Sequence, residues 1–314
     1  MGTFLVKRLV ALIVTALLSS IVVFMLVRSV PGDIVAQMIG QAGNDPQVAA
    51  SLRAFFGLDR PLHLRYLAWL GNVLRGDLGT SWNQGLPVLE IVLRAFAVTI
   101  ELGLLTLLFA TVIGVPLGLI AGIYEGRPVD NVIQGINVLG LSAPVFWVGL
   151  MALIGASALF TWSPPLMYRS PAQDPGENLQ ILLLPILSLG LLQAAAYSQF
   201  VRQSVVSAMH QDYVRTAIAK GLPTRVVFFK HILRNILIPL ITFMGLILIQ
   251  ILGGVVVIES LFALPGLGRL LLTSIQNRDF PLVQGGLLLV VIVAMLINLV
   301  VDLLYQYVDP RMRQ

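Results

Sequence analysis

Residues 102–124 read LGLLTLLFATVIGVPLGLIAGIY, a stretch of 23 residues without a charged side chain. At about 1.5 Å per residue, an α-helix of this length covers a hydrocarbon core of about 30 Å. The stretch therefore predicts a transmembrane helix.

Five further charge-free apolar stretches of similar length occur along the chain. They are Leu9–Val27, a segment within Asn131–Phe160, Asn178–Val201, Asn235–Ile258 and Phe280–Val301. The first one follows Lys7 and Arg8 as a signal peptide would, but it is longer than a signal core and has no small-residue cleavage site. We therefore expect it to be retained, and the sequence predicts an all-α polytopic membrane protein with six transmembrane helices.

The composition agrees with a membrane protein. Apolar residues make up 57% of the chain and charged residues 11%, whereas soluble proteins average about 25% charged. A formal charge of +5 could indicate nucleic acid as a partner, but the Lys and Arg residues flank the apolar stretches and form no basic stripe, so we expect none. The absence of cysteine excludes disulfides and thiol chemistry.

The distribution of basic residues predicts the orientation, because short cytoplasmic loops carry an excess of Lys and Arg. With both termini in the cytoplasm, only Arg169, Arg269 and Arg278 lie in short external segments. The residues that lie inside are Lys7, Arg8, Arg127, Arg202, Arg215, Lys220, Arg225, Lys230, Arg234, Arg311 and Arg313.

The spans divide the chain into three parts. Residues 1–27 hold the N-terminus and first span, residues 28–95 form a small external helical insert, and residues 96–314 form the core. In the insert, Asp45 is expected to cap a helix from Pro46 to Gly57, and a second helix is expected after Pro61. The core contains an internal loop, 202–234, and an external loop, 259–280.

Glycine and proline mark particular positions inside the spans. Gly114, Gly118 and Gly122 recur every four residues, so we expect one face of the second span to pack closely on another helix, most simply within the same chain. The prolines inside spans are expected to bend them. They are Pro116, Pro144, Pro185 and Pro239.

Catalytic and metal-binding patterns are missing from the sequence. His63, His210 and His231 all lie outside the spans, and there is no H-E-x-x-H, G-x-S-x-G or phosphate-loop motif. We therefore expect no enzyme activity, metal or bound cofactor. Because the span centres carry almost no charge, ion-coupled secondary transport is also disfavoured.

The internal loop predicts a short helix that stands off the membrane. Asp212 is a good N-cap, Gly221 can adopt the left-handed conformation that ends a helix, and Pro223 prevents continuation. Thr224 is expected to cap the next helix. A two-turn helix is unstable alone, so it should pack on something. Small Ala217 and Ala219, beside Tyr213 and Val214, could fit a groove, although packing on the chain itself is the alternative.

This loop and its surroundings resemble the inner-membrane permeases of dipeptide, oligopeptide and nickel ABC importers. The matching stretches are 31–33, 56–59 with 61–62, 75–79, 212–221, 231–235 with 238–239, 262–269, 277–281, 298–304 and 309–311. The resemblance implies a type I importer permease fold, in which the short helix is the coupling helix that docks on an ATPase. The implied coupling residues are Asp212, Tyr213, Val214, Arg215, Thr216, Ala217, Ala219, Lys220, Gly221 and Leu222. Arg215 and Thr216 replace the Glu and Ala that importers generally have there, as peptide-type permeases do.

The same resemblance implies the partners. These are a homologous second permease, two ATPase subunits that bind ATP and magnesium, and a periplasmic or lipid-anchored solute-binding protein, all assembled in membrane lipid. It also places a gate loop at the external mouth of the pore, with Leu264, Pro265, Gly266, Gly268 and Arg269. Gly266 and Gly268 are expected to form a tight turn and not a phosphate site.

The expected cargo is a di- or oligopeptide, with a nickel chelate, glutathione or another small solute as alternatives. Candidate pore-lining residues are Glu101, Gln193, Gln199 and Gln250, since polar groups in spans usually face protein or water; hydrogen bonding between helices explains each equally well. Two other classes stay open. One is a membrane scaffold whose basic loop binds anionic lipid, and the other is a secondary transporter.

Overall fold

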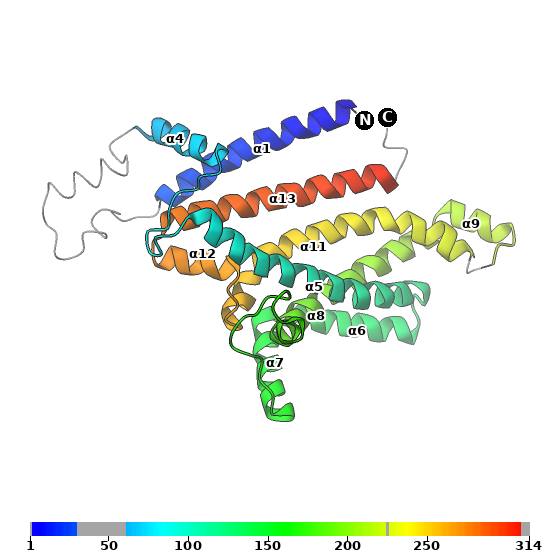
Figure 1. The fold of residues 1–314 in the computed structure, drawn as a ribbon. Helices are drawn as coiled ribbons and strands as arrows, with labels where there is room; N and C mark the ends of the chain where they lie inside the picture. Colours follow the sequence, from blue (N-terminus) through cyan, green and yellow to red (C-terminus); the bar gives the residue numbers. More distant parts are fainter. Residues whose placement is uncertain (1, 30–60, 224–225, 309–314) are drawn as a thin grey trace, which may run out of the picture. The chain divides into compact units, whose positions relative to one another are not determined.

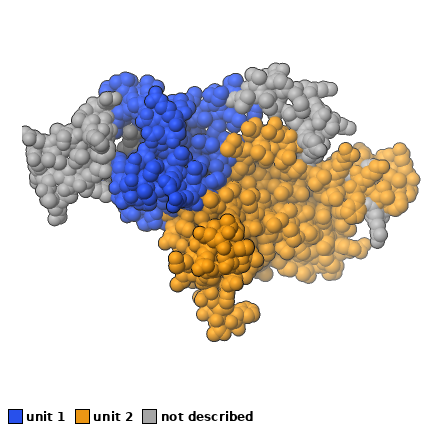
Figure 2. Space-filling model, in the orientation of Figure 1, with its two compact units in different colours: residues 1–96, 270–295 blue, residues 97–269, 296–314 orange. Residues whose placement is uncertain are grey.

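The computed structural model describes residues 2–29, 61–223 and 226–308, and these parts of the chain are helices joined by turns (Figure 1). The described residues contain no β-strand beyond one isolated bridge between Thr80 and Pro87. They form two compact units, residues 1–96 with 270–295 and residues 97–269 with 296–314 (Figure 2). The expected helix at 46–57, the cap at Thr224 and the stretches at 31–33, 56–59 and 309–311 lie outside the described residues.

Four of the expected spans are uninterrupted helices that are long and apolar enough to cross a membrane. They are α1 (Gly2–Ser29), α5 (Val88–Ile123), α8 (Pro175–Met209) and α13 (Phe280–Val308). α5 and α8 continue through Pro116 and Pro185. Each helix begins or ends several residues outside the charge-free stretch that predicted it, because helical backbone continues into polar sequence beyond the apolar core.

The other two expected spans are bent. The third was expected to be one span, but it is two helices, α6 (Pro128–Ser142) and α7 (Val145–Phe160), with an angle of 98° between them. The break falls at Pro144, which cannot donate a backbone hydrogen bond and disfavours helical geometry in the residue before it. The fifth begins as a π-helix, η2 (Val227–Ile232), continues as α11 (Leu233–Leu261) and bends by 43° near Pro239. The described residues thus contain four crossing helices, or up to six if each bent pair is one span.

Three shorter helices complete the described chain: α4 (Leu62–Leu74), α9 (Asp212–Ala219) and α12 (Leu267–Gln276). α4 begins directly after Pro61, as the sequence predicted. α9 is the short helix expected in the internal loop.

In the first unit, a buried carboxylate holds a turn in place. Asp279 is 1% exposed and accepts hydrogen bonds from the Ser81 hydroxyl at 2.5 Å and from the backbone N–H groups of Trp82 and Asn83. Because a buried charge must be hydrogen-bonded, this contact fixes the 81–84 turn at the start of α13.

The second unit is built on the glycine face of α5, which packs on α8 of the same chain. A Cβ atom at Gly118 would lie 2.5 Å from the Ser198 carbonyl oxygen and 2.7 Å from Val201 Cβ. Gly114 and Gly122 meet Tyr197 and Val205 at 2.6 and 2.7 Å in the same way. The expectation of close packing within the chain is confirmed, and it holds because only a residue without Cβ allows this separation.

We predict that Gly118→Ala lowers the thermal unfolding midpoint of the detergent-solubilised protein. The added methyl forces α5 and α8 apart, and overpacking costs about 1–3 kcal/mol. Gly135→Ala is the matched control, because Gly135 lies inside α6 and a Cβ added there would have no described atom within 4 Å. The control should unfold at the same or a slightly higher temperature. Equal midpoints for the two variants would contradict this account of the contact.

Candidate functional site

The short helix α9 ends at a glycine-stabilised C-terminus. Gly221 has φ +76°, its N–H donates to the carbonyl oxygen of Ile218, and the N–H of Leu222 donates to that of Ala217. This pair of bonds is a Schellman motif, and the predicted left-handed role of Gly221 is confirmed. At the other end the prediction was wrong. Asp212 is the first helical residue, the N-cap is Gln211, and no side chain caps the helix.

The two faces of α9 have different environments. Val214 and Ala217 are buried, 2% and 5% exposed, in an apolar cluster with Val205 and Ala208 of α8 and Ile236 of α11. The sequence had placed Val214 and Ala217 on the surface that fits a partner's groove. Val214 and Ala217 lie three residues apart and therefore on one side of α9. That side packs on α8, η2 and α11, so both side chains are buried.

Other side chains of α9, and Leu222 in the turn after it, are open to solvent in the isolated chain. Ile218 is 61% exposed, Leu222 38% and Tyr213 37%. The remaining residues expected to couple are also exposed; they are Asp212, Arg215, Thr216, Ala219, Lys220 and Gly221. Arg215 and Asp212 approach only to 3.9 Å at full exposure, a pair of little energetic value. Ile218 in α9 and Leu222 just after Gly221 are exposed apolar side chains, which water does not favour.

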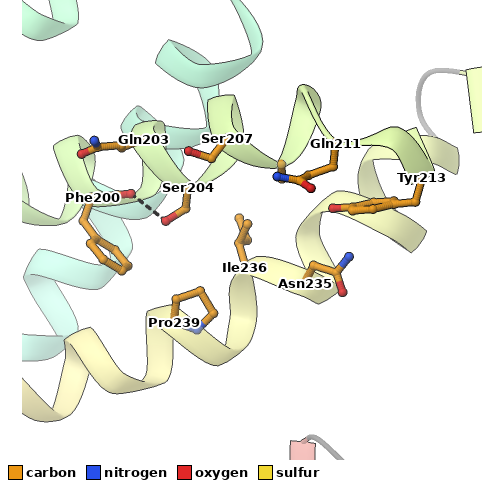
Figure 3. Close-up of a pocket in the computed structure, with 10 residues that line it drawn as sticks. Phe200, Gln203, Ser204, Ser207, Gln211, Tyr213, Asn235, Ile236 and Pro239 are labelled. Atoms are coloured by element: carbon orange, nitrogen blue, oxygen red, sulfur yellow. Dashed lines mark hydrogen bonds between the residues drawn. The ribbon is translucent and has the colours of Figure 1, made fainter. Parts of the chain in front are cut away.

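Beside α9 lies a cavity of about 520 Å³ (Figure 3). Its walls come from α8, α9 and the start of α11. The lining residues are Phe200, Gln203, Ser204, Ser207, Ala208, Gln211, Tyr213, Asn235, Ile236 and Pro239. Sequence reasoning missed this site. The available signal was the recurrence of side chains at 200, 203, 204, 207 and 211, mostly polar, which is one face of a helix.

One basic residue of the internal loop is already paired within the chain. The Arg202 guanidinium makes two hydrogen bonds to the Asp130 carboxylate, at 2.6 and 2.7 Å, and Asp130 is 1% exposed. The N–H of Gly126 also donates to Asp130, at 2.9 Å. This bidentate pair ties the α5–α6 turn to α8, so the charge of Arg202 is not available to a partner.

The external loop is organised by a buried glutamate. Glu259 is 0% exposed and accepts hydrogen bonds from the Thr99 hydroxyl at 2.5 Å and from the backbone N–H of Arg269 at 2.9 Å. The N–H of Leu267 in turn donates to Thr99 at 2.7 Å. The carboxylate therefore sits at the N-terminus of α12, where the helix dipole favours negative charge.

The residues expected in the gate loop are positioned by this contact. Gly266 and Gly268 are buried against Glu259, and a Cβ at either would collide with it or with Val256. Leu264 is 1% exposed and belongs to an apolar cluster with Val98 and Ile258, whereas Pro265 is exposed. The left-handed residue in this turn is Ala263, at φ 55°.

The four candidate pore residues lie on α5, α8 and α11, and none of them lines the cavity beside α9. Glu101 accepts a hydrogen bond from the Tyr168 hydroxyl at 2.5 Å. Burial, and then this bond, raise the pKa of Tyr168 above its usual value. Gln193 is buried in α8, Gln199 is half-buried and Gln250 is exposed on α11. For Glu101, hydrogen bonding between segments is the alternative that the structure supports.

Comparison with known proteins gives consistent matches over the whole chain. A family model described as "Binding-protein-dependent transport system inner membrane component" matches residues 114–314, and the N-terminal model of such membrane components matches residues 1–103. The dipeptide transport system permease protein of Escherichia coli K12 is 36% identical over 99% of this chain and 98% of its own length. The glutathione transport system permease protein of Salmonella choleraesuis is 38% identical over 100% and 99%.

Among solved structures, an amino acid ABC transporter chain matches with a TM-score of 0.54. The match is 14% identical and covers 69% of this chain and 94% of that one, and it shows a shared fold.

We predict that Gly266→Ala loosens the external loop. The new methyl occupies the space of the Glu259 carboxylate, so the N-terminus of α12 must move away from its anion. Hydrogen exchange of the amides at 259–269, followed by mass spectrometry, should become faster. Gly253→Ala, where no described atom lies within 4 Å of the added methyl, is the control and should leave exchange unchanged. Unchanged exchange in both variants would show that Glu259 does not hold the loop.

Proposed function

The chain belongs to the family of binding-protein-dependent transport system inner membrane components, among the peptide ABC importer permeases, and on this premise we propose that α9 is its coupling helix. The supporting observation is that some apolar side chains of α9 and its C-terminal turn are buried in the subunit and others are exposed. Val214 and Ala217 fix the helix to its own subunit, while Ile218 and Leu222 are left for a partner. The helix then acts as a lever: motion of an ATPase bound to the exposed face moves α8 and α11 with it.

The assembly that we propose contains four kinds of chain. This subunit pairs with a homologous permease, two ATPase subunits bind ATP and magnesium and grip the two coupling helices, and a binding protein delivers solute from outside. Hydrolysis takes place on the ATPases. Closure of the ATPases switches the path between outward and inward access, because the ATP-bound pair favours one of the two states.

Di- or oligopeptide is the cargo that we propose, since relatives named for dipeptides match over nearly their whole length. Glutathione is the second candidate, because a relative named for it matches equally well and glutathione also contains amide bonds. The external loop around Leu264 and Pro265 would form the outer rim of the path. Of the candidate pore residues, exposed Gln250 fits a lining position best.

The lever is tested by two aspartate substitutions on the same helix. Ile218→Asp should abolish recovery of the ATPases with the purified subunit and leave its thermal unfolding midpoint unchanged, because the side chain is exposed. Val214→Asp should lower the midpoint, because it places a charge in the apolar cluster. Leu166→Asp, which changes a 93% exposed residue outside the loop, is the control and should retain the ATPases. Full ATPase recovery with Ile218→Asp would contradict the proposed docking face.

The proposed orientation, with both termini in the cytoplasm, is tested in a chain that has no native cysteine. Glu125→Cys lies in the exposed α5–α6 turn and Met167→Cys in the exposed segment before α8. A membrane-impermeant maleimide should label Met167→Cys in spheroplasts and Glu125→Cys in inverted vesicles. The reverse pattern would place the termini outside.

A further inference from the structure

The described residues that line the cavity beside α9 are uncharged, and they include both polar and apolar side chains. Gln203, Gln211 and Asn235 contribute carboxamides, and hydroxyls come from Ser204, Ser207 and Tyr213 (Figure 3). A carboxamide both donates and accepts hydrogen bonds, as a peptide group does. The lining can therefore donate hydrogen bonds to the carbonyl groups of a peptide and accept them from its N–H groups.

None of the charged residues that the structure describes on the same segments lines the cavity. Arg202 is paired with Asp130, and Arg215 and Lys220 lie on the exposed side of α9. An anionic lipid headgroup would be met by Lys or Arg. A bare divalent cation would need clustered carboxylates, and the described residues hold no such group of three. The side chains that line the cavity therefore favour a ligand that is neutral and rich in amide groups.

One end of the cavity is bounded by stacked aromatic rings. Phe200 lines the cavity and stacks on Phe243, with ring centroids 4.1 Å apart and planes 2° from parallel. Tyr197 meets the same Phe243 edge-on at 5.4 Å. The flat face of Phe200 gives apolar parts of a ligand a surface to rest on, whatever their side-chain identity.

We propose that this cavity is an inner solute site that holds a peptide through its main-chain amides, near the coupling helix, before release. The inference rests on the proposed function, and it adds a binding site and a mode of recognition that ignores side-chain sequence. A volume of about 520 Å³ lies within the range of about 300–1,000 Å³ that is common for small-ligand pockets.

A peptide in this cavity also contacts the proposed coupling helix, α9. Tyr213 belongs to α9, Gln203 and Ser207 to α8, and Asn235 to α11, so a bound peptide bridges the coupling helix to both of its supports. A bound peptide therefore moves together with these three segments.

Cysteine protection tests this site. In the nucleotide-free assembled complex, Ser207→Cys is alkylated by N-ethylmaleimide with and without dialanine. If dialanine occupies the cavity, the rate falls as 1/(1 + [L]/Kd), so that ten times the Kd slows alkylation about elevenfold. Met209→Cys is the control, since Met209 is 38% exposed and lies about 200° around α8 from position 207. Free alanine, which has no peptide bond, is the control ligand.

The outcomes separate this inference from the proposed function. Protection of Ser207→Cys by dialanine, but not by alanine, supports the site. Equal rates with and without dialanine, in a complex that retains its ATPases and imports peptide, overturn the site and leave the importer intact. A cysteine that is unreactive in the complex but reactive in the lone subunit also overturns it, because the second permease then covers the cavity. Failure to recover any ATPase counts against the proposed function instead.

Filling the cavity provides a second test. Ser207→Trp should reduce peptide import roughly tenfold or more while ATPase recovery and thermal midpoint stay unchanged, because the indole takes the ligand's space. Met209→Trp makes the same change on the other side of the helix and should retain import. Normal import by Ser207→Trp would overturn the site.

Discussion

The contact between the glycine face of α5 and the backbone of α8 supports everything else in the second unit. Where Gly114, Gly118 and Gly122 meet α8, the helices are too close for any side chain larger than hydrogen. The apolar cluster that starts beside this contact, at Ala110 and Ala194, continues without a break to Val214 and Ala217 of α9. The proposed coupling helix, α9, is thus the last part of one packed core, and packed cores move as rigid bodies.

Buried charge fixes the two ends of this core. Asp130 and Arg202 tie the α5–α6 turn to α8, and Glu259 ties Thr99 to the N-terminus of α12. A buried charge without a partner is costly, so each pair permits one arrangement of the segments it joins. Between these anchors, α11 has a π-helical start and a 43° bend, which are the places where a helix most easily changes shape.

Much of this could be predicted from residues alone, because the signals are local. The length of the apolar stretches predicted the six spans, and the four-residue spacing of glycines predicted the close packing of α5 on another helix. Gly221 predicted where α9 ends. The sequence predicted a bend at Pro144 but not its angle of 98°, because a proline inside a helix can cause anything from a slight kink to a full break. The inward face of α9 and the cavity beside it were not predictable, because both depend on which neighbours α8 and α11 bring together.

The rigidity of the lever is the central claim, and a distance measurement tests it most directly. Nitroxide labels at Glu125→Cys and Thr216→Cys report the separation between the α5–α6 turn and α9 in the cysteine-free chain. In the assembled complex, pulsed electron spin resonance should give the same narrow distance distribution without nucleotide and with bound ATP. A distribution that shifts or broadens when ATP binds would show that α9 moves independently of its own subunit.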